Sequence, residues 1–260
     1  MVTPTATATG RATFEDDWCP RAYLTEYYGE VQHDEQVTMR FLAEAAAFVG
    51  DVPVLLEFGC GPTVHHLLPF ATRAGELHVA DYLERNLDAV RGWVEGHDDA
   101  WDWTAFVDVA LRNELGRPPH DWEVREREAA TRERITVFHR ADARRRHPLA
   151  GRPRRYPAVL CCFCPDSMTD DIDEWRRCTE NVASLVSPGG WLVLTALAGA
   201  SSYRVGDVEF PSPGVTIDDL AGVLRSAGFS GLGTTIMTAD TIDDDDHGFD
   251  SVLLAVSRRP

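Results

Sequence analysis

Two glycines and three acidic residues are placed where they could bind a ligand. Glu57, Gly59 and Gly61 directly follow a short apolar run, and glycine suits a backbone that must touch a ligand, since a Cβ would hold the ligand off. Asp81 ends the next apolar run, and Asp142 follows a third. Because the ends of parallel strands meet at one sheet edge, these residues are expected to share a ligand site there. Asp81 could accept hydrogen bonds from ribose hydroxyls and Asp142 one from an adenine amino group, although both aspartates could also be helix caps or surface loop acids.

The spacing of the turn favours a ligand without phosphate. Dinucleotide sites use G-x-G-x-x-G, in which a third small residue allows close helix packing and free amides bind the pyrophosphate. Here Val64 occupies the third position, and Pro62 removes one amide donor. S-adenosylmethionine carries a ribose and an adenine but no phosphate, so the sequence favours this cofactor over a nicotinamide dinucleotide.

Apolar runs alternate with helical patterns around these residues, which predicts a Rossmann-like α/β fold with a mostly parallel sheet and an antiparallel edge strand. Strands are expected at 54–58, 77–80, 135–139, 158–163, 191–197, 231–238 and 249–257. Helices are expected at 63–72, 84–95 and 172–185, and after an N-cap at Thr216. Ser187-Pro188-Gly189-Gly190 is expected to end the third of these helices.

A single domain is predicted over residues 14–260, behind a disordered tail at 1–13 whose Thr, Ala and Gly offer nothing to pack. Residues 14–52 are expected to form an N-terminal cap or lid, with a helix that carries Val37, Phe41, Ala45 and Phe48 on one stripe. Residues 97–134 are charged and rich in tryptophan, and they are expected to form an insertion.

The charge balance argues against polyanionic partners. The chain has 42 acidic and 25 basic residues, a net charge of −17, which repels nucleic acid and anionic membranes. No apolar run reaches the ~18 residues of a membrane span. The first residues lack a secretory pattern, so a cytoplasmic protein is expected. No sustained heptad argues for a dimer, and a monomer is expected.

No metal site is expected from the cysteines or from the acidic run near the C-terminus. Cys161, Cys162 and Cys164 crowd together without the spacing of metal ligands, so they are interpreted as a buried strand in a reducing compartment. The run from Asp243 to His247 does not alternate its acids with other residues as a calcium loop does, so a solvated hairpin loop is expected.

Several motifs together resemble the nicotinamide, phenylethanolamine and indolethylamine N-methyltransferase family, over nearly the whole chain from Pro20. The most specific part is Gly-Pro-Thr after the glycine turn, together with the paired tyrosines upstream. The motifs are Tyr23-Leu24-Thr25-Glu26-Tyr27-Tyr28, Glu57-Phe58-Gly59-Cys60-Gly61-Pro62-Thr63, Ala80-Asp81-Tyr82 with Asn86-Leu87, Trp101-Asp102-Trp103, Ser187-Pro188-Gly189-Gly190 and Ser201-Ser202-Tyr203.

The resemblance implies a class I S-adenosylmethionine-dependent methyltransferase and assigns roles at the cofactor. Tyr23 and Tyr28 would lie over the cofactor, Gly59 and Thr63 would hold its amino-acid end, Asp81 and Asn86 would bind the ribose, and Asp142 with Ala143 would bind the adenine. The full expected cofactor set is Tyr23, Tyr28, Glu57, Gly59, Gly61, Thr63, His65, Asp81, Tyr82, Asn86, Asp142 and Ala143.

The chain departs from the family where an acceptor would bind. His65 stands where relatives often place tyrosine, Ala196 where members that bind amides or amines place an acid, and Ala200 where a serine is expected. The candidate acceptor contacts are Tyr23, Cys164, Asp166, Ala196, Ala200, Tyr203 and Ser212. The candidate catalytic residues are Tyr23, with Asp166 and His65 as possible bases.

The sequence is therefore interpreted as a small-molecule methyltransferase that methylates an amine or a nitrogen heterocycle. An aliphatic amine must lose a proton before it attacks, which requires a base. With Ala196 in place of an acid, an acceptor whose lone pair is free at neutral pH is favoured. An O- or S-methyltransferase, a nicotinamide-dependent oxidoreductase and a cofactor-binding protein without turnover remain as alternatives.

Overall fold

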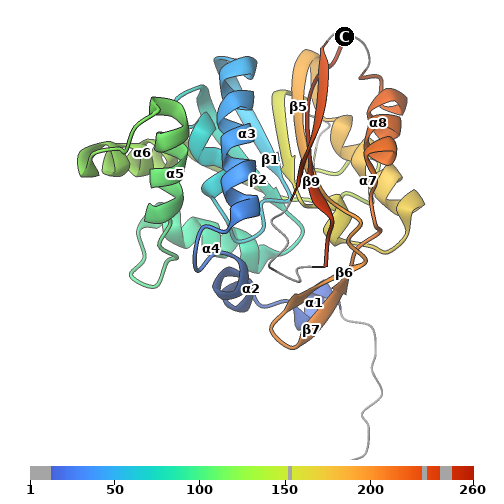
Figure 1. Ribbon diagram of the computed structural model, residues 1–260, viewed down its shortest axis with the longest axis horizontal. Helices are drawn as coiled ribbons and strands as arrows, with labels where there is room; N and C mark the ends of the chain where they lie inside the picture. The colour runs from blue at the N-terminus through green and yellow to red at the C-terminus, as the bar shows by residue number, and fades with distance from the viewer. Residues whose placement is uncertain (1–12, 152–153, 230–232, 241–247) are drawn as a thin grey trace, which may run out of the picture.

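A computed structural model describes residues 13–151, 154–229, 233–240 and 248–260 (Figure 1). The central sheet has seven strands in the order β3-β2-β1-β4-β5-β9-β8. Its strands are β1 (Val52–Phe58), β2 (Ala74–Asp81), β3 (Ile135–Arg140), β4 (Tyr156–Cys162), β5 (Val186–Ala198), β8 (Thr234–Asp240) and β9 (Ser251–Arg258). Strands β1 to β5 are parallel, and β9 runs antiparallel to both β5 and β8. This confirms the expected mostly parallel sheet with antiparallel pairing at one edge.

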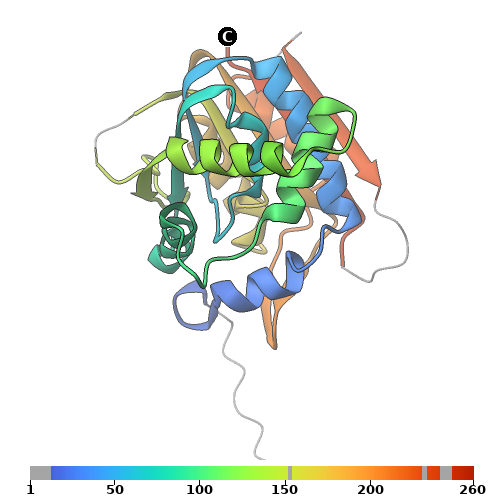
Figure 2. The ribbon, with the colours of Figure 1, turned by 90° about the vertical axis from the view of Figure 1, so that its left-hand side faces the viewer.

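Helices cover both faces of the sheet, and each face has its own buried cluster of apolar side chains. One face carries α3 (His33–Val49), α4 (Glu84–Glu95), α5 (Thr104–Leu115), α6 (Asp121–Arg134) and the 3-10 helix η1 (His65–Phe70). The other carries α7 (Ile172–Ala183) and α8 (Ile217–Ser226). Helices α5 and α6 make up the segment expected as an insertion; α5 packs against α3, and α6 packs against α5 and η1 (Figure 2).

Capping residues set the starts of the last two helices. The Asp171 side chain accepts hydrogen bonds from two amides in the first turn of α7. Thr216 and Asp219 form a reciprocal capping box at α8. Helix α7 buries Trp175, Cys178 and Val182, which recur at helical spacing. Both helices therefore form where the pattern predicts them.

Two expected elements differ in the structure. The helix expected at 63–72 is only the short η1, because Pro69 lies inside it and cannot donate to an α-helical ladder. The segment Ser187–Gly190 does not stop a helix, since α7 has already ended at Ala183 and β5 has begun at Val186. Glycine still matters there, because Gly189 adopts a positive φ of 75° within the strand.

The apolar stripe expected on α3 is partly wrong. Phe41 and Ala45 are buried, but Phe48 is 60% exposed and meets Trp191 at the helix end. The buried side of α3 instead includes Met39 and Leu42. Helix α3 thus packs on the face of the sheet. Within the expected cap at 14–52, only the residues that precede α3 lie at the edge of the sheet.

The N-terminal segment and a hairpin lie together below the main sheet in Figure 1. The segment holds α1 (Phe14–Asp17) and α2 (Pro20–Tyr27), and the hairpin holds β6 (Ser202–Val205) and β7 (Val208–Pro211). The Phe14 ring stacks on Phe210 with centroids 5.0 Å apart, and Trp18 meets the same ring. Aromatic packing therefore joins the start of the chain to a segment almost 200 residues away.

Some expectations fall outside the described residues, and others are confirmed. Residues 1–12 of the expected tail, residues 231–232 and the acidic run at Asp243–His247 lie outside. Cys161 and Cys162 lie buried in β4, and all six cysteines are free. Within the described chain, no helix has the length and apolarity that crossing a membrane requires.

Candidate active site

A cavity opens at the carboxyl ends of β1, β2 and β4, and residues of the N-terminal segment and the β6–β7 hairpin also line it. The space between its side chains, including the open mouth, is about 1290 Å³. Eleven of the predicted site residues line this cavity: Tyr23, Tyr28, Gly59, Gly61, Thr63, Asp81, Tyr82, Asn86, Ala143, Cys164 and Tyr203. The structure therefore brings most of the predicted set to one place.

The glycine turn after β1 is held by its own amides. Gly59 and Cys60 both donate to the Ala80 carbonyl, at 2.7 and 3.1 Å, and Gly61 donates to the Asp81 carboxylate at 2.9 Å. Both glycines have positive φ values, 75° and 57°. Since these amides already have partners, they do not form a free cradle for phosphate, in agreement with a phosphate-free ligand.

Asp81 is the polar centre of this end of the cavity. Besides Gly61, its carboxylate accepts hydrogen bonds from the Leu83 amide at 2.8 Å and from Asn86 Nδ2 at 3.0 Å. Burial raises the pKa of Asp81, and the three donors counteract part of that rise. One lone pair of Oδ2 remains available, which suits one ligand hydroxyl.

Trp18 connects the N-terminal segment to this polar centre. Its indole Nε1 donates to Asn86 Oδ1 at 2.8 Å, while Asn86 in turn donates to Asp81. The segment before α2 is therefore fixed to the side chains that are expected to bind the ribose. Trp18 is not among the residues predicted from the sequence, although it lies only five residues before Tyr23.

Tyrosines from the N-terminal segment and the β6–β7 hairpin also line the cavity. The Tyr23 and Tyr28 hydroxyls lie 3.2 Å apart, the Tyr27 hydroxyl donates to the Arg204 carbonyl at 2.7 Å, and the Tyr203 hydroxyl donates to the Ser167 carbonyl at 3.1 Å. Burial raises the pKa of Tyr27 to about 12 and also raises those of Tyr23, Tyr28 and Tyr203. These side chains therefore act as neutral hydroxyls rather than as bases.

Seven predicted residues do not line the cavity: Glu57, His65, Asp142, Asp166, Ala196, Ala200 and Ser212. Glu57 is 1% exposed, and its carboxylate is bound to His66 Nδ1 at 3.1 Å, behind the turn. Asp142 accepts from the Arg144 amide at 3.0 Å, as a loop acid does, and its neighbour Ala143 lines the cavity instead.

The expected acceptor residues Ala196, Ala200 and Ser212 lie outside the lining of the cavity. Side chains alternate along a strand, so Leu197 lines the cavity while Ala196 is buried on the α7 and α8 face. Ala200 is also buried in the fold, with 1% exposure. The Ser212 hydroxyl is buried without a hydrogen-bond partner among the described residues. The lack of an acid at Ala196 therefore does not decide the chemistry of the cavity.

The two predicted bases are both buried and engaged. Asp166 accepts a hydrogen bond from the Leu197 amide at 2.9 Å, and burial raises its pKa to about 7. His65 is fully buried, and its Nε2 is bonded to Glu35 Oε2 at 3.1 Å. Burial holds the pKa of His65 well below its usual value. Each lies behind the lining rather than in it.

The structure adds polar residues that the sequence analysis missed. Asp34 and Glu35, from the first turn of α3, and His66, from η1, line the cavity. Burial raises the pKa of the Glu35 carboxyl. His66 could have been found from the sequence, since it follows His65. Asp34 and Glu35 could not, because nothing in the start of a helix reveals which of its acids faces a cavity.

The sheet order, the glycine turn after β1 and the carboxylate at the end of β2 match the fold of class I S-adenosylmethionine-dependent methyltransferases. The same fold occurs in the N-methyltransferase NodS from Bradyrhizobium japonicum WM9 in complex with S-adenosyl-L-homocysteine, with a TM-score of 0.52 and 15% identity, covering 88% of this chain and 89% of the other.

Sequence comparison identifies the family. The NNMT/PNMT/TEMT family matches residues 6–259. Human nicotinamide N-methyltransferase is 27% identical, with 85% of this chain and 86% of the relative covered. Mouse indolethylamine N-methyltransferase is 31% identical, with 77% and 78% covered. The chain belongs to the NNMT/PNMT/TEMT family and is an S-adenosylmethionine-dependent methyltransferase of small molecules.

Proposed function

We propose that this enzyme transfers a methyl group to a nitrogen atom of a small amine or nitrogen heterocycle. The observation that carries the proposal is that one cavity is lined by two groups of residues, the glycine turn with Asp81 first and the tyrosines with Glu35 second. Relatives named for nicotinamide and indolethylamine N-methylation support nitrogen as the acceptor atom.

The residues of the first group fit S-adenosylmethionine. Gly61 has nothing within 4 Å of the position that a Cβ would occupy, so the turn leaves room for a ligand against its backbone. Asp81 offers one further acceptor for a ribose hydroxyl, and Ala143 offers an apolar contact for the adenine. When bound, the cofactor supplies an activated methyl group on its sulfonium.

The second group suits a planar nitrogen compound. Tyr23, Tyr27 and Tyr203 give aromatic surfaces for stacking, and Asp34 and Glu35 give negative groups near the same wall. These acids replace the one missing at Ala196, so amines are suitable acceptors alongside heterocycles with a free lone pair. The chain then acts chiefly by orienting the acceptor nitrogen, an effect that can supply about 7–11 kcal/mol.

A labelled-methyl assay tests the proposal. The purified chain is incubated with S-adenosylmethionine carrying a ¹³C methyl group and a panel of amines, azines, phenols and thiols. We expect products whose ¹³C shifts identify N-methyl groups, and less product from the Asp81→Ala variant at a cofactor concentration that just saturates the parent. Only O- or S-methyl products would replace nitrogen as the acceptor, and cofactor binding without any product would favour a binding protein.

We also propose that the enzyme acts as a cytoplasmic monomer on a free small molecule, without a nucleic-acid or membrane partner. The net charge of −17 supports the absence of polyanionic partners. Light scattering of the purified chain tests the monomer, since a mass of twice 28.9 kDa would contradict it.

A further inference from the structure

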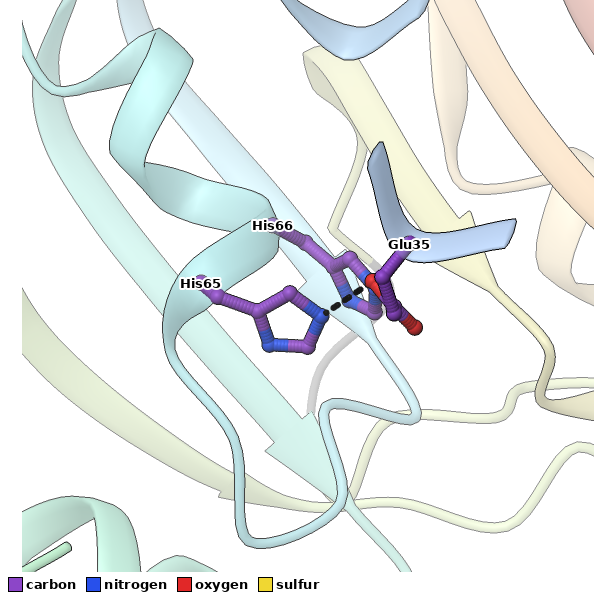
Figure 3. Close-up of side chains that lie close together, drawn as sticks. All are labelled: Glu35, His65 and His66. Atoms are coloured by element: carbon purple, nitrogen blue, oxygen red, sulfur yellow. Dashed lines mark hydrogen bonds and ion pairs between the residues drawn. The ribbon is translucent and has the colours of Figure 1, made fainter. Parts of the chain in front are cut away.

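Three buried side chains of metal-binding type converge where η1 meets the start of α3. His65 and His66 project from η1 toward Glu35 of α3 (Figure 3). One ligand atom from each of the three lies within 4.8 Å of the other two. Their exposed fractions are 6% for Glu35, 0% for His65 and 4% for His66. Such a cluster is unusual, because glutamate is mostly exposed in proteins unless it is paired, and histidine is only intermediate in burial.

Each histidine of the cluster uses one ring nitrogen in a hydrogen bond and leaves the other without a partner. His65 Nε2 is bonded to Glu35 Oε2 at 3.1 Å, and His66 Nδ1 is bonded to Glu57 Oε1 at 3.1 Å. His65 Nδ1 and His66 Nε2 are buried and have no hydrogen-bond partner among the described residues, and the Cys162 thiol interacts with the His66 ring. A buried polar atom without a partner costs about 1–3 kcal/mol. A cation bound to His66 Nε2 would remove that cost.

The outer contacts resemble those of a metal-bound histidine. A histidine that binds a metal through one nitrogen almost always donates the other N–H to a carboxylate, carbonyl or water, which fixes the ring. Glu57 does this for His66 Nδ1. Trp103 stacks on His65 at 5.1 Å and 13°, which holds the second ring in place. Both rings are therefore oriented before any ion binds.

Charge also favours a cation at this place. Glu35 and Glu57 put two carboxyl groups into a buried region shared with two imidazoles, and buried charge is costly unless it is paired or bound to metal. Two imidazoles and one carboxylate form a ligand set that zinc uses with a further position open. Glu35 and His66 line the cavity, so that position would be reached from the cavity.

We propose that Glu35, His65 and His66 bind a divalent transition-metal ion, with zinc as the ion that the ligand set favours. The inference goes beyond methyl transfer and does not depend on it. The sequence suggests no metal at the cysteines or at the acidic run, and the three ligands proposed here belong to neither. Glu35 lies 30 residues before the adjacent His65 and His66, a spacing that matches no metal motif.

The test measures metal directly in the whole 260-residue chain. The chain is stripped with a chelator, reloaded with Zn²⁺, desalted and analysed for metal and protein. We expect about one zinc per chain, and Co²⁺ loading should give visible ligand-field bands that zinc abolishes. A protein that retains no zinc after desalting and shows no cobalt bands would overturn the proposal.

Variants locate the ion. Glu35→Gln keeps the shape of the side chain and should weaken zinc binding at least ~100-fold, as should His66→Gln, and Glu57→Gln should weaken it ~10–100-fold through the outer contact. His97→Gln is the matched control, since His97 and Glu95 form an exposed pair at 3.0 Å. Zinc binding unchanged in Glu35→Gln and His66→Gln, or lost in His97→Gln, would contradict the site.

Folding is checked separately from metal content. Each variant is titrated with S-adenosyl-L-homocysteine and melted, so that a variant that is merely unfolded is recognised. If His66→Gln does not fold, Glu35→Gln, which can still accept the hydrogen bond from His65, decides the question. In the parent protein, cofactor binding without zinc binding would overturn the metal site and leave the proposed methyl transfer intact.

Discussion

The carboxylate of Asp81 accepts a hydrogen bond from the amide of Gly61 at 2.9 Å, which ties the end of β2 to the turn after β1. A single side chain therefore both shapes the glycine turn and offers an acceptor to the ribose. Loss of this carboxylate should affect the cofactor more than the fold, because the main-chain bonds from Gly59 and Cys60 to Ala80 also hold the turn.

Replacing Asp81 by alanine should weaken binding of S-adenosyl-L-homocysteine by roughly 10–150-fold, since hydrogen bonds to a charged group contribute ~1.5–3 kcal/mol. Isothermal titration calorimetry measures the change. Asp88→Ala is the control, because Asp88 lies on α4 with its side chain 60% exposed. Equal affinities for the Asp81→Ala variant and the parent would show that the ribose binds elsewhere.

Gly59→Ala should destabilise the protein by roughly 2–4 kcal/mol. Its added Cβ would lie 2.1 Å from Cys164 Sγ and 2.3 Å from Cys164 Cβ, and the residue would keep a φ of 75°. Gly61→Ala meets nothing within 4 Å and should cost only the backbone strain, about 1 kcal/mol. Urea unfolding compares the two variants.

The double variant Gly59→Ala with Cys164→Gly separates collision from strain. Removing the Cys164 side chain leaves only its Cα, at 3.7 Å from the new Cβ. We therefore expect a favourable coupling of about 1–3 kcal/mol in a double-mutant cycle. Additive costs would mean that Cys164 moves aside without penalty.

Trp18→Phe should speed the release of S-adenosyl-L-homocysteine by roughly 5–10-fold. The substitution keeps an aromatic ring against Phe210 but removes the hydrogen bond to Asn86, a loss of about 1 kcal/mol. Stopped-flow displacement measures the rate. Trp122→Phe, at a site 57% exposed, should release the product at the parental rate. An unchanged rate in Trp18→Phe would argue against an N-terminal lid.

Asp166 should make the protein less stable as the pH rises. Its pKa is about 7 in the folded state and 3.8 when unperturbed, so the folded state binds the proton more tightly and stability falls from about pH 4 to about pH 7. Asp166→Asn cannot ionise and can still accept from Leu197. Its melting temperature should exceed that of the parent more at about pH 8 than at about pH 5.

Between about pH 5 and about pH 8, the difference in stability between Asp166→Asn and the parent should grow by on the order of 2 kcal/mol. This corresponds to roughly 4–8 °C in melting temperature for a chain of this size. Melting curves at about pH 5, 6.5 and 8 measure it. A difference between Asp166→Asn and the parent that stays constant across these values would mean that the carboxyl does not titrate in this range.

The sheet and the cofactor end of the site were accessible from sequence because they depend on local signals. Glycines at positive φ, an acid at the end of a strand and a capping box each have a chemical reason at their own positions. Gly59, Gly61 and Asp81 line the cavity as expected, and α8 begins at its predicted cap.

The acceptor end depends on which way side chains point, and the sequence pattern does not settle this. Ala196 and Leu197 are neighbours on β5, yet only Leu197 lines the cavity. Glu35 reaches the cavity because α3 packs against η1, a contact between segments 30 residues apart. Such long-range packing has no periodic signature, so the pairing of Glu35 with His65 could not be predicted.

The two groups of residues that line the cavity belong to parts of the chain that contribute differently to the fold. Asp81 and the glycine turn are built into strands that hold the core together, whereas Tyr23, Tyr27 and Tyr203 sit on the N-terminal helices and a hairpin outside the sheet. New acceptor preferences could thus evolve by exchange of these outer segments while the methyl donor's cradle stays unaltered.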